Sequence, residues 1–258
     1  IYKCSPFGSI SHSHGDQNAF TLHAFGDTLA AITGYYGGFG VDMHLKWRRQ
    51  TFSKNLPLFG GKGQYAENTS SKFADHQDRY CIEAGGHICD YDTEAEVPFV
   101  EGDATASYQY FNPDLKSYKR KIWFVKGKLF VMRDTATLKT AQDLTWLLHT
   151  TFETETANQS FQIMGEKAVL DVSFINDSKD DILSIEAVEG FGEVDPAEYK
   201  ELDVHRHVEA NFKAKKEHDI LTLLVPSKVG AAQIAVTHKL VGDTLELTID
   251  GEQVSIRL

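Results

Sequence analysis

Cysteine and proline are scarce in this sequence for its length. The 258 residues include three cysteines and six prolines, against sixteen phenylalanines and ten tyrosines. So few cysteines, and an odd number of them, argue against a disulfide framework in a chain of this size. Many aromatic residues with few prolines favour a sheet-rich chain. The length suits one large β-domain or two small ones.

Several functional motifs are also missing. No apolar run approaches the length of a membrane span. The glycine-rich segment 57–63 lacks the Gly-Lys-Ser/Thr ending of a phosphate loop, and no helical pattern follows it, which excludes a nucleotide site. No Gly-x-Ser-x-Gly elbow occurs, so a serine nucleophile has no support. Because the sequence starts at Ile1, with no methionine and no signal-like segment, we expect an internal piece of a longer protein.

Positive charge is scarce overall, with 26 basic residues against 37 acidic ones and a net charge of −11. This balance argues against a general affinity for nucleic acid. One segment differs, because no acidic residue occurs from His44 to Tyr65, and its basic residues are Lys46, Arg48, Arg49, Lys54 and Lys62. Salt screens charges beyond about 8–10 Å, so this patch can attract an anionic polymer in spite of the total charge. The alternative is a solvated basic loop.

Short alternating segments separated by turn signals run through most of the chain. Period-two patterns predict strands at residues 20–24, 29–33, 104–111, 122–125, 129–132, 144–151, 168–175, 182–188, 220–225, 233–238, 245–249 and 254–258. Hairpin turns are predicted at Gly26-Asp27, at residues 126–128 and at Asp250-Gly251. We therefore expect an all-β fold, a large antiparallel β-sandwich with one short helix at Pro196. Rising polarity at residues 154–160 marks a possible break between two subregions.

The densest polar cluster lies in residues 9–36. Its head, residues 11–18, reads Ser-His-Ser-His-Gly-Asp-Gln-Asn and enters the first predicted strand. A cluster anchored by a strand and its hairpin can be held in a fixed geometry, which catalysis requires. His12 and His14 project from one face and either chelate a metal, transfer protons or form a satisfied structural pair. The segment 205–207, His-Arg-His, repeats this spacing without a third ligand nearby, so we expect surface residues there.

Other side chains near this cluster have two interpretations each. Gln17 and Asn18 either present amide donors to a carboxylate or tie the strand entry to the backbone. Asp16 can orient an imidazole. Tyr35 and Tyr36 open a glycine-rich aromatic loop, residues 35–40, whose rings either stack on a sugar or fold onto the sheet edge.

Three blocks of the sequence resemble the C-terminal β-domain of heparinase II/III-like polysaccharide lyases. The segment SHSHGDQNAF, residues 11–20, is similar to that family's His-Ser-His-(Ala/Gly)-Asp strand entry. Asn55 after Lys54, followed by the glycines of residues 60–64, resembles a second block, and residues 123–125 with 130–134 resemble a third. The SHSH form followed by Asp-Gln-Asn is most similar to the exolytic oligoalginate lyase branch.

The resemblance implies a lyase that cleaves uronate-containing polysaccharide or oligosaccharide, alginate- or heparin-type, by β-elimination. That reaction needs a group to neutralise the carboxylate, a base for the C5 proton and an acid for the leaving oxygen. The resemblance implies that His12 is catalytic and faces a cleft shared with an N-terminal helical toroid domain, which is absent from this chain. The residues then expected to bind substrate are Gln17, Asn18, Tyr35, Tyr36, Arg48 and Arg49. His14 and Asp16 are expected to contact the catalytic and binding residues rather than the substrate.

The resemblance also bears on metals, partners and location. Some relatives hold a structural metal, and two of their ligand positions correspond here to Ile32 and Lys54, so we expect no metal and no cofactor. The expected partners are an anionic polysaccharide or oligosaccharide and the missing toroid domain, with no nucleic acid and no membrane span. The expected location is periplasmic or secreted. The alternative is a non-catalytic β-sandwich that binds carbohydrate or serves as a scaffold, and the isolated domain is expected to be inactive.

Overall fold

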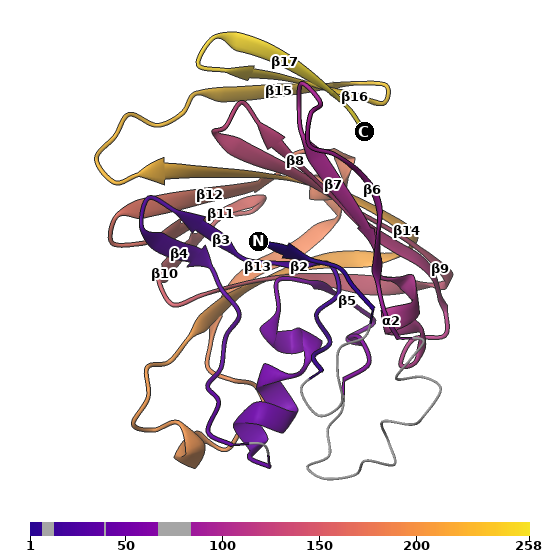
Figure 1. Ribbon diagram of the computed structural model, residues 1–258, viewed down its shortest axis with the longest axis vertical. Helices are drawn as coiled ribbons and strands as arrows, with labels where there is room; N and C mark the ends of the chain where they lie inside the picture. Colours follow the sequence, from indigo (N-terminus) through magenta and orange to yellow (C-terminus); the bar gives the residue numbers. More distant parts are fainter. Residues whose placement is uncertain (7–12, 39, 67–83) are drawn as a thin grey trace.

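The computed structural model describes residues 1–6, 13–38, 40–66 and 84–258, so that residues 7–12, 39 and 67–83 lie outside the described part. Its centre is a ten-stranded antiparallel sheet (Figure 1). The strands are β5 (Pro57–Phe59), β6 (His87–Asp92), β7 (Phe99–Asp103), β8 (Leu115–Val125), β9 (Leu129–Thr150), β10 (Glu153–Thr156), β11 (Ser160–Met164), β12 (Ala168–Phe174), β13 (Ile182–Glu189) and β14 (Arg206–Lys228). Their order is β10-β11-β12-β14-β9-β8-β7-β6, while β13 pairs with β14 and β5 with β9. The predicted all-β fold is confirmed.

Smaller sheets cover the large one. β1 (Tyr2–Lys3) pairs with β2 (Ala19–Phe20), β3 (Leu22–Ala24) pairs with β4 (Asp27–Ala30), and β15 (Val236–Val241), β16 (Thr244–Ile249) and β17 (Glu252–Arg257) form a three-stranded sheet. In Figure 1, β15–β17 lie at one end of the molecule, and the helical turns between β4 and β5 lie at the other.

Two hydrophobic cores lie on opposite faces of the large sheet. Val131 of β9 belongs to the core under β16 and β17, whereas its neighbour Met132 belongs to the core under β2–β4. Leu223 and Leu224 of β14 divide in the same way. Successive side chains of a strand point to opposite faces, so the large sheet is a middle layer with both faces buried.

The two longest strands join segments that the sequence shows as separate. β9 and β14 pair from Thr150 with Arg206 to Phe130 with Leu224, with register shifts between Phe212 and Glu217. The predicted strands at residues 129–132 and 144–151 are the two ends of β9, and the one at 220–225 is the end of β14. Their exposed polar middles hide this continuity in the sequence.

The helices are short. η5 (Pro196–Glu198) is a 3-10 turn at the predicted place, and the Asp195 carboxylate accepts a hydrogen bond from Ala197 N at 2.9 Å. The sequence did not predict the other helical segments: η1 (Met43–Arg48), η2 (Thr51–Ser53), α2 (Thr105–Gln109) and η4 (Asp177–Asp181). Within the described ranges, no helix has the length and apolar character to cross a membrane.

The strand predicted at residues 104–111 is wrong, since α2 lies there. β7 ends at Asp103, whose carboxylate accepts a hydrogen bond from Thr105 N at 2.9 Å and starts the helical turn. The adjacent residues Ser107 and Tyr108 are both buried. A half-buried strand would place them on opposite faces, whereas a helical turn lets both face the interior.

The first hairpin is shifted by one residue from its predicted place. Its turn residues are Phe25 and Gly26, with φ of 51° and 95°, and Asp27 already belongs to β4. The Asp27 carboxylate accepts hydrogen bonds from Lys167 N (2.7 Å) and Ala168 N (3.0 Å), which fixes it against the hairpin of β11 and β12. Residues 154–160, the possible break between subregions, lie in β10, in β11 and in the turn between them. These two strands are hydrogen-bonded neighbours in the large sheet.

Candidate functional site

The polar motif enters the described structure at Ser13 and is fastened by the segment after η1. Arg49, fully buried, donates from Nε to Ser13 O (2.9 Å) and from Nη2 to Ser13 Oγ (3.1 Å). Gly15 N donates to Arg49 O (2.9 Å), and Thr51 Oγ1 donates to Gly15 O (3.0 Å). A Cβ on Gly15 would lie 2.8 Å from Thr51 Oγ1, so the close approach requires glycine. Arg49, predicted to bind substrate, here holds the loop.

Gln17 is also buried, and most of its polar atoms form hydrogen bonds within the protein. Its backbone N donates to Gln64 Oε1 (2.8 Å), and Gln64 Nε2 donates to Gln17 O (2.6 Å). Its own Oε1 accepts a hydrogen bond from Ser5 N at 2.8 Å. Its Nε2 has no hydrogen-bond partner among the described residues. Of the Gln17 side chain, only this amide nitrogen has no partner among the described residues, so it is the one atom that could act as the predicted amide donor.

Asn18 ties the loop to the large sheet. It adopts φ of 68°, a left-handed conformation that asparagine tolerates better than most residues. Its Oδ1 accepts from Tyr2 Oη (2.6 Å), its Nδ2 donates to Gly102 O (3.0 Å), and its carbonyl accepts from Arg120 Nη1 (2.9 Å). With no exposed surface and both amide atoms engaged, Asn18 fixes the strand entry rather than presenting donors to a ligand.

A buried ion pair lies beneath this loop. Arg120 donates to the Asp134 carboxylate from Nε (2.7 Å) and from Nη2 (3.0 Å). Its Nη1 reaches Asn55 O at 2.6 Å. Asp134 also accepts from Tyr118 Oη (2.8 Å) and Trp146 Nε1 (3.0 Å). Every charge in the pair is therefore satisfied, which a buried ion pair needs in order to be tolerated.

A cluster of rings and one cation forms beside the loop. The ring centroids of His14 and His44 are 6.2 Å apart, and those of Tyr36 and His44 are 5.0 Å apart at 86°. Arg48 Cζ lies 5.4 Å from the centroid of the Tyr36 ring. Tyr36 is 53% exposed, and no carboxylate within the described ranges forms an ion pair with Arg48. We call His14, Tyr36, His44 and Arg48 the His14–Arg48 cluster; it presents an aromatic face and a guanidinium that no described carboxylate pairs with.

A buried ammonium lies behind this cluster. Lys54 has no exposed surface, and its Nζ donates to Arg48 O (2.5 Å) and to Ser53 Oγ (2.8 Å). Burial lowers the pKa of Lys54 to about 7. Burial, followed by the positive charges of Lys54 and Arg48, lowers the pKa of His14 to about 2. His14 is therefore a neutral imidazole near neutral pH, able to hydrogen-bond through both ring nitrogens but not to take up a second proton.

The other residues predicted to belong to the site lie in different environments. Asp16 is buried and forms an ion pair with Lys3. Tyr35 turns away from Tyr36 and donates from Oη to Asp203 O at 2.9 Å. His12 lies outside the described residues, so its catalytic role stays a prediction. In the part of the chain that the structure describes, no three His, Cys, Asp or Glu side chains are placed to hold a metal ion, and the absence of a metal likewise stays a prediction.

A family model described as heparinase II/III-like, C-terminal, matches residues 1–237. The chain belongs to this family. Its fold is similar to that of a heparinase III with methylated lysines (17% identity, TM-score 0.70, 99% of this chain and 37% of that one). It is also similar to a heparan sulfate lyase HepC mutant from Pedobacter heparinus (18% identity, TM-score 0.70, 99% of this chain and 38% of that one). The chain thus spans well under half of these solved relatives. No curated protein sequence matches.

The family domain also contains a buried histidine pair that the sequence did not indicate. His207 is 5% exposed, so the prediction of surface residues at 205–207 is wrong for it. Its ring stacks on that of His149 at 4.9 Å and 17°, because the two residues are directly paired between β14 and β9. Trp47 of η1 packs against both rings, at 6.0 Å and 5.6 Å. Only the strand register, which depends on β9 and β14 pairing at long range, reveals this contact.

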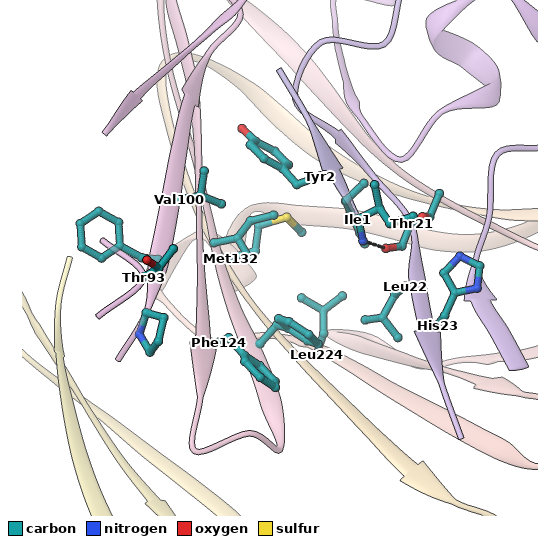
Figure 2. Close-up of a pocket in the computed structure, with 15 residues that line it drawn as sticks. Ile1, Tyr2, Thr21, Leu22, His23, Thr93, Val100, Phe124, Met132 and Leu224 are labelled. Carbon is teal, nitrogen blue, oxygen red and sulfur yellow. Dashed lines mark hydrogen bonds between the residues drawn. The ribbon is translucent and has the colours of Figure 1, made fainter. Parts of the chain in front are cut away.

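A separate apolar cavity of about 330 Å³ opens between β1–β3 and the large sheet (Figure 2). Figure 2 shows Leu22 from one side and Phe124, Met132 and Leu224 from the other around the same space. Its lining is mostly apolar, and His23 is the one imidazole at its edge. A charged group therefore finds polar partners at the His14–Arg48 cluster and few in this cavity.

Proposed function

We propose that this chain is the β-domain of a polysaccharide lyase that cleaves uronate-containing glycans by β-elimination. The domain supplies one wall of the active site and the histidine His12. The observation that carries the proposal is the His14–Arg48 cluster, an exposed tyrosine ring beside a guanidinium that forms no ion pair with the described residues. It stands next to the histidine motif in a chain that belongs to the heparinase II/III-like family.

The cluster suits the first requirement of uronate elimination. The guanidinium of Arg48 neutralises a sugar carboxylate, which makes the adjacent C5 proton easier to remove. The Tyr36 face stacks against the sugar ring, and the imidazoles of His14 and His44 lie behind it. His12 takes the proton, since its motif continues directly into His14. The acid that protonates the leaving oxygen comes from a helical domain outside this chain.

The substrate class follows from two sources. The relatives with solved structures are named heparinase III and heparan sulfate lyase. The SHSH motif, in contrast, is most similar to the exolytic oligoalginate lyases. Both kinds of glycan contain uronate, so we propose uronate-containing glycans as the substrate class. The experiment compares alginate-type with heparin-type glycans. A periplasmic or secreted location is part of the same proposal.

One observation favours a second function, a carbohydrate-binding or scaffolding domain without catalysis. Asn18 and Arg49, two of the predicted substrate contacts, are fully buried and bonded to the protein. Tyr36 and Arg48 alone still make an aromatic, cationic surface on which a uronate can bind without being cleaved. This function predicts binding with no product.

The experiment gives the full-length protein a panel of alginate- and heparin-type polymers and oligomers. Elimination creates an unsaturated uronate, which is followed by its ultraviolet absorbance. We expect activity on at least one uronate, and the 258-residue chain alone should be inactive. His12→Ala should lower turnover by about 10²–10⁴-fold, the usual contribution of a positioned acid–base group.

His23→Ala serves as the matched control, because His23 is an exposed imidazole of β3 that bonds only Thr28 among the described residues. It should leave turnover unchanged. Full turnover in His12→Ala would show that the histidine is structural. No product from any uronate, with retained binding, would favour the scaffolding function.

A further inference from the structure

The connection between β13 and β14, residues 190–205, folds back onto the segment that carries the His14–Arg48 cluster. Glu198, in η5, accepts hydrogen bonds at Oε1 from Asp42 N (3.2 Å) and at Oε2 from Met43 N (2.9 Å). These are amides at the start of η1, where the preceding residue Asp42 provides no side-chain cap of its own. A carboxylate from 155 residues further along the chain therefore supplies the N-terminal cap of η1.

Apolar packing reinforces this contact. Phe191 and Val194 form one buried cluster with Met43 and Trp47 of η1, and Tyr199 packs against it. The rings of Phe191 and Trp47 are 6.0 Å apart in an edge-to-face arrangement. The apolar side of η1 is thus buried against the 190–205 connection, which leaves His44 and Arg48 on the side of the cluster.

The end of the same connection holds the residues before Tyr36. His205 Nδ1 accepts a hydrogen bond from Gly34 N at 3.2 Å, and Asp203 O accepts one from Tyr35 Oη at 2.9 Å. The rings of Tyr35 and His205 are 4.8 Å apart. Two of the three pieces of chain that carry the cluster, residues 34–36 and η1, are therefore held by the connection between β13 and β14.

We propose that Glu198 is a positioning residue for this site: by capping η1 it fixes Arg48 relative to Tyr36 so that the pair receives a sugar carboxylate. The inference rests on the proposed function. Glu198 itself is on the outside of η1, bonded to its backbone, and it does not contact substrate. Its loss therefore acts through Arg48, by loosening the first turn of η1.

The experiment compares Glu198→Ala, Glu198→Gln and Glu201→Ala in the full-length protein. Glu201 is an exposed carboxylate of the same connection that forms no side-chain hydrogen bond or ion pair with the described residues, so it controls for the loss of charge. Two quantities are measured: hydrogen exchange at the amides of Asp42 and Met43, and KM and kcat on the best uronate substrate.

Glu198→Ala should speed exchange at both amides about fivefold, the effect of losing a typical helix cap. KM should rise by a similar factor and kcat should fall as well, because Arg48 both binds the sugar carboxylate and stabilises its charge while the C5 proton is removed. Glu198→Gln keeps one acceptor and should fall between Ala and the parent. Glu201→Ala should match the parent in both measurements.

Unchanged exchange in Glu198→Ala would overturn the inference, and so would faster exchange with an unchanged KM in an active parent. A general rise in exchange across β9 and β14 would also overturn it, since it would mark a structural role for the whole fold. A parent with no activity on any uronate would instead contradict the proposed function, while the exchange at Asp42 and Met43 would still decide whether Glu198 holds η1.

Discussion

The polar residues in and around the histidine motif have different roles. Asn18 and Arg49 are fully buried and satisfy backbone groups of the loop, while Arg48, next in the chain to Arg49, remains without an ionic partner in the described structure. Adjacent arginines on a helical turn point in different directions, so one can fasten the loop and the other can face a ligand. Sequence alone gives both the same chemistry, and only their burial separates the two tasks.

Residue-scale stability should depend strongly on Asp134. Asp134→Asn leaves the buried Arg120 guanidinium without its counter-charge and should lower the free energy of unfolding by about 3–5 kcal/mol. Arg133→Gln, one residue earlier, breaks the partly exposed pair with Asp219 and should cost about 0–1 kcal/mol. Urea unfolding of both variants measures the difference. Equal costs would mean that the buried network contributes no more than a surface pair.

At the scale of the element, η1 depends on a glycine that precedes it. Gly34 has φ of 95°, and a Cβ there would lie 2.7 Å from Trp47 Cδ1. Gly34→Ala should therefore add overpacking of about 1–3 kcal/mol to the strain of its backbone conformation. Gly61 is the matched control, because its φ is 69° and a Cβ there meets nothing within 4 Å. Urea unfolding should give Gly34→Ala a free energy of unfolding at least about 1 kcal/mol below that of Gly61→Ala. Equal free energies would contradict the close packing.

Elements with regular alternation could be predicted from the sequence, and irregular ones could not. β16 and β17 join through Asp250 and Gly251, both with positive φ, as their sequence predicts. α2 was not predicted because small and aromatic residues alternate in its sequence as they do in a strand. η1 escaped because its cap, Glu198, comes from a distant part of the chain, so that no local signal marks its start.

The candidate site shows the same limit. The motif and the basic segment could be located, because their residues cluster in the sequence. Their arrangement could not, since the positions of Tyr36, His44 and Arg48 depend on the 190–205 connection and on β14. Lys54 is a further example: it was expected to lie at a lost ligand position, and its complete burial behind Arg48 emerges only from the packing.

At the scale of the whole molecule, the large sheet is the layer on which the other parts depend. Its two faces support separate cores, and the candidate site lies at the end opposite β15–β17 (Figure 1). The loops at the site end are held by hydrogen bonds from Asn18 to Gly102 of β7, from Asn55 to Phe20 of β2 and from Met43 of η1 to Glu198, and by the apolar cluster around Trp47. The buried Lys54 and His149 and the partly buried His14 also lie at this end, so its stability should respond strongly to pH.

The pH dependence of stability can be derived from the shifted groups. Burial lowers the pKa of His14 to about 2 and that of His149 well below its ordinary value. Below pH 6.5 the unfolded chain takes up protons at these histidines that the folded chain does not, so stability falls as the pH falls. From pH 6.5 to 5 each contributes up to about 2 kcal/mol. His149→Gln should reduce this acid slope, whereas His23→Gln, at an exposed site, should not.

On the alkaline side two effects oppose each other. Burial lowers the pKa of Lys54 to about 7, so the unfolded chain holds the extra proton between about pH 7 and 10.5 and stability rises with pH there. Burial raises the pKa of Cys4 to about 12 and that of Tyr118 well above its usual value, so the unfolded chain loses protons first above about pH 9–10 and stability falls. Urea midpoints from pH 5 to 10.5 should thus climb, level off near about pH 9 and then decline. A profile that peaked near pH 6 would mean that Lys54 and the buried histidines keep ordinary pKa values in the folded chain.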